Sequence, residues 1–153
     1  MKRNSKKSGN RENGEKEEGE IKKRISNASA KEKGRKFQQW ACQQISDLLG
    51  IPWGKDELIA SREASQTGTD VRLVGEARDR FPFAVECKWQ ESWDVPAWIR
   101  QARENETEGT DWLLLMKKNR FEPVVVMDAE RFFALLRRIQ DDNKSGNRKL
   151  PKP

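Results

Sequence analysis

The stretch Phe83–Trp89 constrains the fold more than any other part of the chain. Side chains of a β-strand alternate between its two faces, so every second residue of this stretch shares one apolar face. Glu86 and Lys88 then lie side by side on the opposite face. We therefore predict a strand with one face against a core, and with a carboxylate and an ammonium group presented on the other.

A second acid precedes this strand. The polar loop Ser61–Thr69 leads into a short predicted strand, Asp70–Val74, which begins with the acid. Two neighbouring strands of one sheet would bring Asp70 close to Glu86 and Lys88. We expect these three side chains to form one site.

A long helix is predicted before these strands. Ser29 and Glu32 have the spacing of a capping box, in which each side chain satisfies a backbone N–H at the helix start. Apolar residues then recur at helical spacing, and Gly50 and Pro52 stop the helix. The expected helix is Ala30–Leu49.

The remaining elements follow from periodicity and capping signals. Leu58–Ala60 is a possible first strand, residues 75–80 turn the chain back, and a helix capped by Asp94, with Pro96 in its first turn, runs up to Gly109. The apolar runs 111–116 and 123–127 suit strands covered on both faces. A last helix, capped by Asp128, is expected to turn a set of apolar side chains towards the core: Phe132, Phe133, Leu135, Leu136 and Ile139. The order αβββαββα predicts an α/β fold with a central mixed sheet flanked by helices.

The charge of the chain is unevenly distributed. The formal net charge is +6, yet residues 29–140 hold eighteen basic and eighteen acidic residues, so the excess lies in the two ends. We predict a disordered basic arm over 1–28, one domain over 29–140 and a flexible basic tail over 141–153. Basic arms favour a phosphate-rich partner such as nucleic acid, and tails that only keep the protein soluble are the alternative.

Several functional classes are excluded by composition. The chain has no His and no Tyr, which removes Ser-His-Asp and Cys-His catalysis, histidine-based metal centres and tyrosine recombinases. Cys42 and Cys87 cannot form a zinc site alone and are expected to be reduced core thiols. With no membrane-length apolar run and no signal-peptide core, we expect a soluble cytoplasmic protein without membrane contact.

Two converging carboxylates and a lysine suit a hard divalent cation. Mg²⁺ takes oxygen ligands and keeps several waters, so Asp70, Glu86 and the backbone carbonyl of Cys87 would suffice. Lys88 could then orient the nucleophile while the cation stabilises charge on a phosphate, which favours phosphodiester hydrolysis. Without a metal, Glu86 and Lys88 would be an ordinary solvated ion pair.

These residues resemble the PD-(D/E)XK nuclease superfamily. Asp70 is followed after fifteen residues by Glu86-Cys87-Lys88, and then by Gln101 on the next predicted helix. The resemblance covers the element order over roughly residues 29–138 and is greatest to the archaeal and phage-type Holliday junction resolvases. It implies a restriction-endonuclease-like core. It implies a homodimer that cuts branched DNA with Mg²⁺, for which Mn²⁺ can substitute, in a prokaryotic cell or as a phage protein acting there. It also implies that Gln101 supports Lys88 or a phosphate.

The chain departs from the superfamily pattern at two positions. Thr69 stands where the motif has Pro, which affects only the local turn. Gln38 stands where many members carry a metal-supporting Glu on the first helix. Glu32 is the nearest acid and an alternative metal ligand, although its capping role already explains it.

Further residues are candidates for nucleic-acid contact. Ser65 and Thr67 could bind a phosphate or only shape their loop, and the turn with Lys117, Lys118 and Arg120 could bind backbone or be a plain solvated turn. Trp89, Trp93 and Trp98 are expected in the core or a dimer interface, with base stacking as the alternative.

The sequence thus predicts a Mg²⁺-dependent DNA endonuclease for branched or junction DNA. The rival is a catalytically silent nucleic-acid-binding or scaffolding protein of the same fold. A restriction or repair nuclease for linear duplex is the third possibility.

Overall fold

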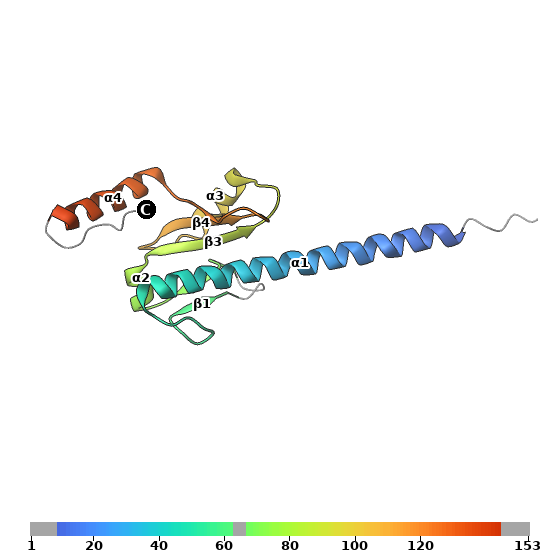
Figure 1. Ribbon diagram of the computed structural model, residues 1–153, viewed down its shortest axis with the longest axis horizontal. Helices are drawn as coiled ribbons and strands as arrows, with labels where there is room; N and C mark the ends of the chain where they lie inside the picture. The colour runs from blue at the N-terminus through green and yellow to red at the C-terminus, as the bar shows by residue number, and fades with distance from the viewer. Residues whose placement is uncertain (1–8, 63–66, 145–153) are drawn as a thin grey trace, which may run out of the picture.

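The computed structural model describes residues 9–62 and 67–144, with side chains from residue 28 onwards. Its elements are α1 (Gly9–Leu49), β1 (Ile59–Ser61), β2 (Val71–Leu73), α2 (Glu76–Arg80), β3 (Phe83–Trp89), α3 (Val95–Glu104), β4 (Asp111–Lys117), β5 (Val124–Val126) and α4 (Ala129–Lys144), as Figure 1 shows. The predicted order is confirmed, with the short helix α2 added where a turn was expected. Ala77 anchors α2 because its side chain is fully buried.

The predicted α/β fold with a mixed sheet flanked by helices is confirmed, although the strands are divided between two sheets where we expected one. β3 pairs in parallel with β4, and β4 pairs antiparallel with β5, which gives a mixed three-stranded sheet. β1 and β2 form a separate antiparallel pair. The backbone N–H of Asp70 donates to the carbonyl of Val85 at 2.9 Å, so the small sheet is attached to β3 just before β2 begins.

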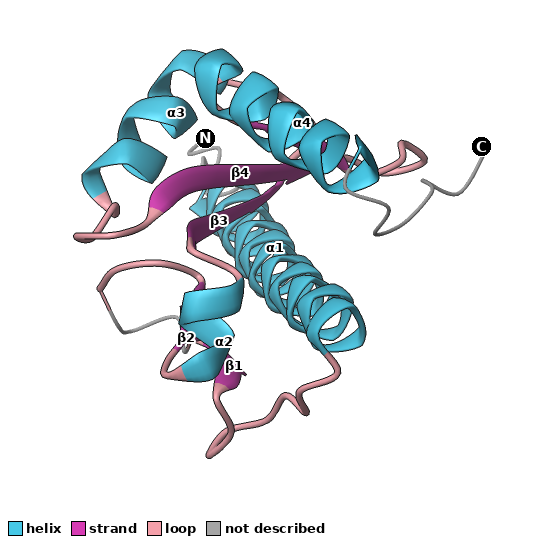
Figure 2. Cartoon of the chain, turned by 90° about the vertical axis from the view of Figure 1, so that its left-hand side faces the viewer, coloured by secondary structure: helices cyan, strands magenta, loops and turns pink. Residues whose placement is uncertain are grey.

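Helices cover both faces of the larger sheet, as Figure 2 shows for α1 on one side of β3 and β4 and α3 on the other. Val85 and Cys87 of β3 pack into the core cluster that contains Phe37, Ala41 and Ile45 of α1. The opposite face of β4 packs against α3 through a second cluster: Trp98, Ala102, Trp112, Leu114 and Met116. The alternation of side chains predicted for Phe83–Trp89 is confirmed. Every second residue from Phe83 packs into the α1 cluster, and Glu86 and Lys88 lie on the opposite face of the strand.

The first helix begins much earlier than predicted. α1 extends back to Gly9, so Ser29 lies inside the helix and does not cap it, and Glu32 instead pairs with Lys36 at 2.8 Å. Lys, Glu and Arg dominate the added segment, and their high helix propensity lets the helix continue through Ser29. No described helix is long and apolar enough to span a membrane. The division into arm, domain and tail stays a prediction.

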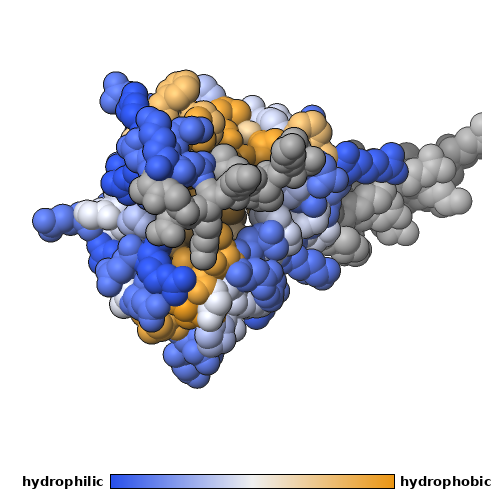
Figure 3. Space-filling view, turned by 60° about the vertical axis from the view of Figure 1, so that its left-hand side comes forward, coloured by the Kyte–Doolittle hydropathy of each residue, from blue (hydrophilic) through white to orange (hydrophobic). Residues whose placement is uncertain are grey.

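The last helix and the last strand are less buried than predicted. None of the apolar residues of α4 is buried, and Phe133 is 55% exposed. Val125 of β5 is 57% exposed, so β5 is not covered on both faces. Among the described strands, β5 is at the edge of its sheet with β4 as its neighbour. Apolar side chains consequently reach the surface between hydrophilic ones on the face drawn in Figure 3. The Asp128 cap is confirmed, since its Oδ1 accepts from the N–H of Glu130 at 2.9 Å.

Candidate active site on strand β3

Strand β3 holds a buried ion pair. Glu86 is 3% exposed, and it is the charged residue buried most deeply in the described chain. Lys88, two residues later on the same face, places its Nζ 2.8 Å from Glu86 Oε1. A buried carboxylate is costly unless it is paired and hydrogen-bonded, so the ion pair with Lys88 offsets part of the cost of burying Glu86.

Helix α3 completes the hydrogen bonding of this pair. Lys88 Nζ donates to Gln101 Oε1 at 2.8 Å, and Asn105 Nδ2 donates to Glu86 Oε2 at 3.1 Å. Gln101 and Asn105 are four residues apart and therefore lie on one face of the helix end. Both Glu86 oxygens are engaged, and Lys88 is held between two acceptors. We did not predict Asn105, although its spacing from Gln101 was visible in the sequence.

Asp70 lies at the junction of three elements. Its Oδ2 accepts the backbone N–H of Cys87 in β3 at 2.7 Å, and its Oδ1 accepts from Gln38 Nε2 of α1 at 2.6 Å. Burial, followed by the negative charge of Glu86, raises the pKa of Asp70 to about 6, against the opposing effects of its hydrogen bonds and of Lys88. The two carboxylates are therefore close enough to repel each other, which is the situation that a bound cation relieves.

The first helix reaches the site through Gln38 rather than through Glu32. Gln38 is the residue that stands in place of the expected Glu, and its amide donates directly to Asp70. Glu32 is exposed and held by Lys36, which lowers the pKa of its carboxyl group. The structure thus brings together Asp70, Glu86, Lys88, Gln101 and Gln38, and leaves Glu32 outside this set of contacts. The catalytic roles stay predictions.

The donors fit a cation that keeps part of its water shell. Residues 9–62 and 67–144 contain no group of three or more His, Cys, Asp or Glu side chains placed to hold a metal. Asp70 and Glu86 provide two carboxylates, which suits Mg²⁺ and not a closed zinc site. The thiol of Cys87 is buried on the α1 face, where burial raises its pKa well above the usual value, so only its backbone carbonyl could be a ligand.

The predicted basic turn lies at the end of β4, next to the end of β3, because Lys88 is paired with Met116. Lys117 Nζ lies 5.1 Å from the centre of the Trp89 ring, and Lys118 Nζ lies 5.1 Å from the Trp93 ring. Both lysines are thereby stacked against aromatic rings. Arg120 is exposed, and its backbone has the left-handed conformation of a turn, with φ 56°. Thr67 is exposed, Trp98 is buried in the α3 core, and Ser65 lies outside the described residues.

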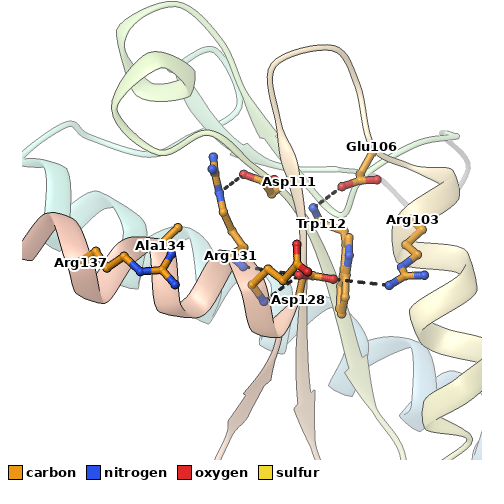
Figure 4. A pocket seen from close by; sticks show the side chains of 9 residues that line it. Arg103, Glu106, Asp111, Trp112, Asp128, Arg131, Ala134 and Arg137 are labelled. Atoms are coloured by element: carbon orange, nitrogen blue, oxygen red, sulfur yellow. Dashed lines mark hydrogen bonds and ion pairs between the residues drawn. The ribbon is translucent and has the colours of Figure 1, made fainter.

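A polar crevice of about 720 Å³ lies elsewhere, between α3, the start of β4 and α4 (Figure 4). Its charges are largely matched by one another. Arg131 pairs with Asp111 at 2.5 Å, and Arg103 with Asp128 at 3.7 Å. None of the predicted site residues lines this crevice, so it is separate from the site on β3.

A family model described as "Phage putative PDDEXK endonuclease" matches the chain over residues 29–147. Comparison with curated proteins and with solved structures gives no match. The matched segment contains every element from the second half of α1 to α4 and the whole site on β3.

Proposed function

Because the chain belongs to the phage PDDEXK endonuclease family, we propose that it is a metal-dependent endonuclease that hydrolyses phosphodiester bonds in DNA. The observation that carries the proposal is the meeting of Asp70 with the Glu86–Lys88 pair on β3. We further propose branched or Holliday-junction DNA as the substrate, on the resemblance to the junction resolvases. Linear duplex is the competing substrate.

Asp70, Glu86 and the carbonyl of Cys87 would hold Mg²⁺, with Mn²⁺ as a substitute. When bound, the cation supplies Lewis-acid stabilisation of the charge that develops on the phosphate. The raised pKa of Asp70, caused by burial and then by the charge of Glu86, supports this role, because a cation stabilises the ionised form of such a carboxyl group. Gln38 supports Asp70 by donating to the oxygen that Cys87 does not engage.

Lys88 would position the attacking water or a phosphate oxygen. Its Nζ is fixed by Glu86 and Gln101, both at 2.8 Å, and an ammonium group has three donor hydrogens. One hydrogen therefore remains for the substrate. Gln101 acts as a positioning residue because it touches Lys88 and restricts where that third hydrogen points.

The partner contacts follow from charge and exposure. Exposed Thr67 before β2, and half-buried Lys117 and Lys118 with exposed Arg120 at the end of β4, would contact the DNA backbone. The exposed apolar residues of α4 support a homodimer, since a second copy could cover them. We place the reaction in the cytoplasm of a prokaryotic cell, where phage DNA is processed.

The test is cleavage of labelled linear, flapped, single-stranded and four-way-junction DNA with Mg²⁺, Mn²⁺ or chelator. We expect metal-dependent cleavage by the native chain, and a loss of about 100-fold or more in Asp70→Ala and Lys88→Ala, with DNA binding retained. Glu76→Ala is the matched control, because it removes an exposed carboxylate that pairs with Arg80 and lies outside the site.

Undiminished cleavage by either site variant would refute the assignment. Salt-sensitive binding without cleavage of any substrate, with either metal, would favour the silent DNA-binding protein instead. Preference for linear duplex over the junction would favour a restriction or repair nuclease.

A further inference from the structure

A basic cleft of about 1170 Å³ lies between α1 and the small sheet of β1 and β2, which run beside each other in Figure 1. Five cationic side chains line it: Lys31, Arg35, Lys55, Arg62 and Arg72. Its lining acids are Glu32 and Asp56, and Glu32 is already paired with Lys36. The cleft therefore carries a marked positive charge, although residues 29–140 as a whole are neutral.

The cations of the cleft differ in how firmly they are held. The guanidinium of Arg72 donates to the carbonyls of Lys55 and Glu57 at 3.2 and 2.8 Å, and that of Arg62 donates to the carbonyl of Thr67. These contacts fix two charges on one wall. On the other wall, Lys31 and Arg35 are exposed and form no ion pair with any described residue. They are available to an anionic ligand.

The cleft adjoins the site on β3 through Gln38. Gln38 lines the cleft and also donates to Asp70 Oδ1 at 2.6 Å. From the opposite wall, the backbone N–H of Arg62 donates to the carbonyl of Asp70 at 2.9 Å. A ligand that fills the cleft therefore ends beside the carboxylate that we propose as a metal ligand.

We infer that this cleft binds the phosphate backbone of the DNA strand that leads to the cleaved bond, an inference that rests on the proposed function. Lys31 and Arg35 are one helical turn apart, a rise of about 6 Å along α1. Phosphates of one strand follow each other at about 3.4 Å along a duplex axis, so the pair matches phosphates about two nucleotides apart. The fixed guanidinium groups of Arg62 and Arg72 face them from the other wall.

The experiment measures binding of labelled linear duplex and four-way junction to the full chain in chelator, over a series of KCl concentrations. We expect Lys31→Ala/Arg35→Ala to reduce the slope of log K against log [KCl] by about 2, because each lost phosphate contact removes about 0.9. Near 0.1 M salt, the affinity should fall by about 10- to 100-fold. Arg137→Ala/Arg138→Ala is the matched control, since it removes the same charge from a helix outside the cleft.

An unchanged slope and affinity in the cleft variant would overturn the inference, provided that its circular dichroism and melting match the native chain. Equal losses in the cleft and control variants would also overturn it, since the effect would then be one of net charge. A polyglutamate peptide that binds with the same dependence on Lys31 and Arg35, while DNA binding does not depend on them, would point to an acidic protein partner and refute a DNA cleft. Since binding is measured in chelator, an absence of cleavage by the native chain would refute the proposed function and leave this result readable.

Discussion

Replacing Asp70 with Asn should stabilise the metal-free protein at neutral and alkaline pH. Asp70 is a half-buried carboxyl group near Glu86, and its pKa is raised from 3.8 to about 6. The side chain of Asn keeps the shape, and its oxygen can still accept from Cys87. Its amide would face Gln38, whose own amide can rotate to present oxygen, so the hydrogen bonds of the native site are preserved.

The size of the effect follows from the pKa shift. The native state binds the Asp70 proton more tightly than the unfolded state, so the contribution of this group is fully present below pH 3.8 and is lost as pH rises through about 6. A shift of roughly two units corresponds to about 3 kcal/mol. Relative to the native chain, the Asn variant should therefore gain up to about 3 kcal/mol of unfolding free energy between pH 4 and pH 8.

Urea unfolding of both proteins in chelator, from pH 4 to pH 8, measures this difference. The matched control is Asp47→Asn, an exposed aspartate that also accepts a glutamine amide, here from Gln43 at 2.7 Å. The reasoning would be refuted if the free energies of unfolding of the native chain and Asp70→Asn changed in parallel with pH. It would also be refuted if the native chain became more stable relative to the variant as pH rises. Added Mg²⁺ should narrow or reverse the difference, because a ligand at 100 times its Kd stabilises the native chain by about 2.7 kcal/mol.

Two further predictions concern α1 and α4. Gln38→Glu adds a third carboxylate at Asp70, so it should destabilise the chain in chelator and tighten Mg²⁺ binding, as measured by melting over a metal titration; weaker Mg²⁺ binding would contradict a metal site at Asp70. Phe133→Glu should shift a homodimer to monomer in light scattering without lowering the melting temperature of the monomer, because this side chain is 55% exposed; an unchanged mass for the variant would exclude α4 as the dimer interface.

The parts of the site that lie on a regular strand or helix could be predicted from the sequence, because side chains repeat there at a fixed spacing. Two-residue alternation places Glu86 beside Lys88, and a capped helix with known phase brings Gln101 to them. The contact between Gln38 and Asp70 joins residues thirty-two positions apart, which no local pattern specifies. Asn105 is the C-cap of α3, and its four-residue spacing from Gln101 was a signal in the sequence that we did not use.

Two predictions were wrong because they relied on the local sequence alone: the burial of α4 and the start of α1. The apolar stripe of α4 predicts an amphipathic helix, and it does not reveal whether another layer covers that stripe. Ser29 and Glu32 have the spacing of a capping box, yet the helix-forming residues before Ser29 allow α1 to continue through it. The basic cleft could not be predicted because the net charge over 29–140 is zero, and this sum does not depend on how the charged residues are arranged in space.

The single helix α1 contributes residues to the core, to the site on β3 and to the basic cleft. Phe37 lies in the core, Gln38 contacts Asp70, and Arg35 and Lys31 lie three and seven residues before Gln38 on the cleft wall. At 1.5 Å per residue, the two cations stand about 4.5 and 10.5 Å from Gln38 along the axis. At about 3.4 Å per nucleotide, these distances correspond to one and three phosphates from the position of Gln38 beside Asp70. If α1 sets this register, the strand is held within about three nucleotides of the site, and cleavage depends on backbone geometry there rather than on base sequence.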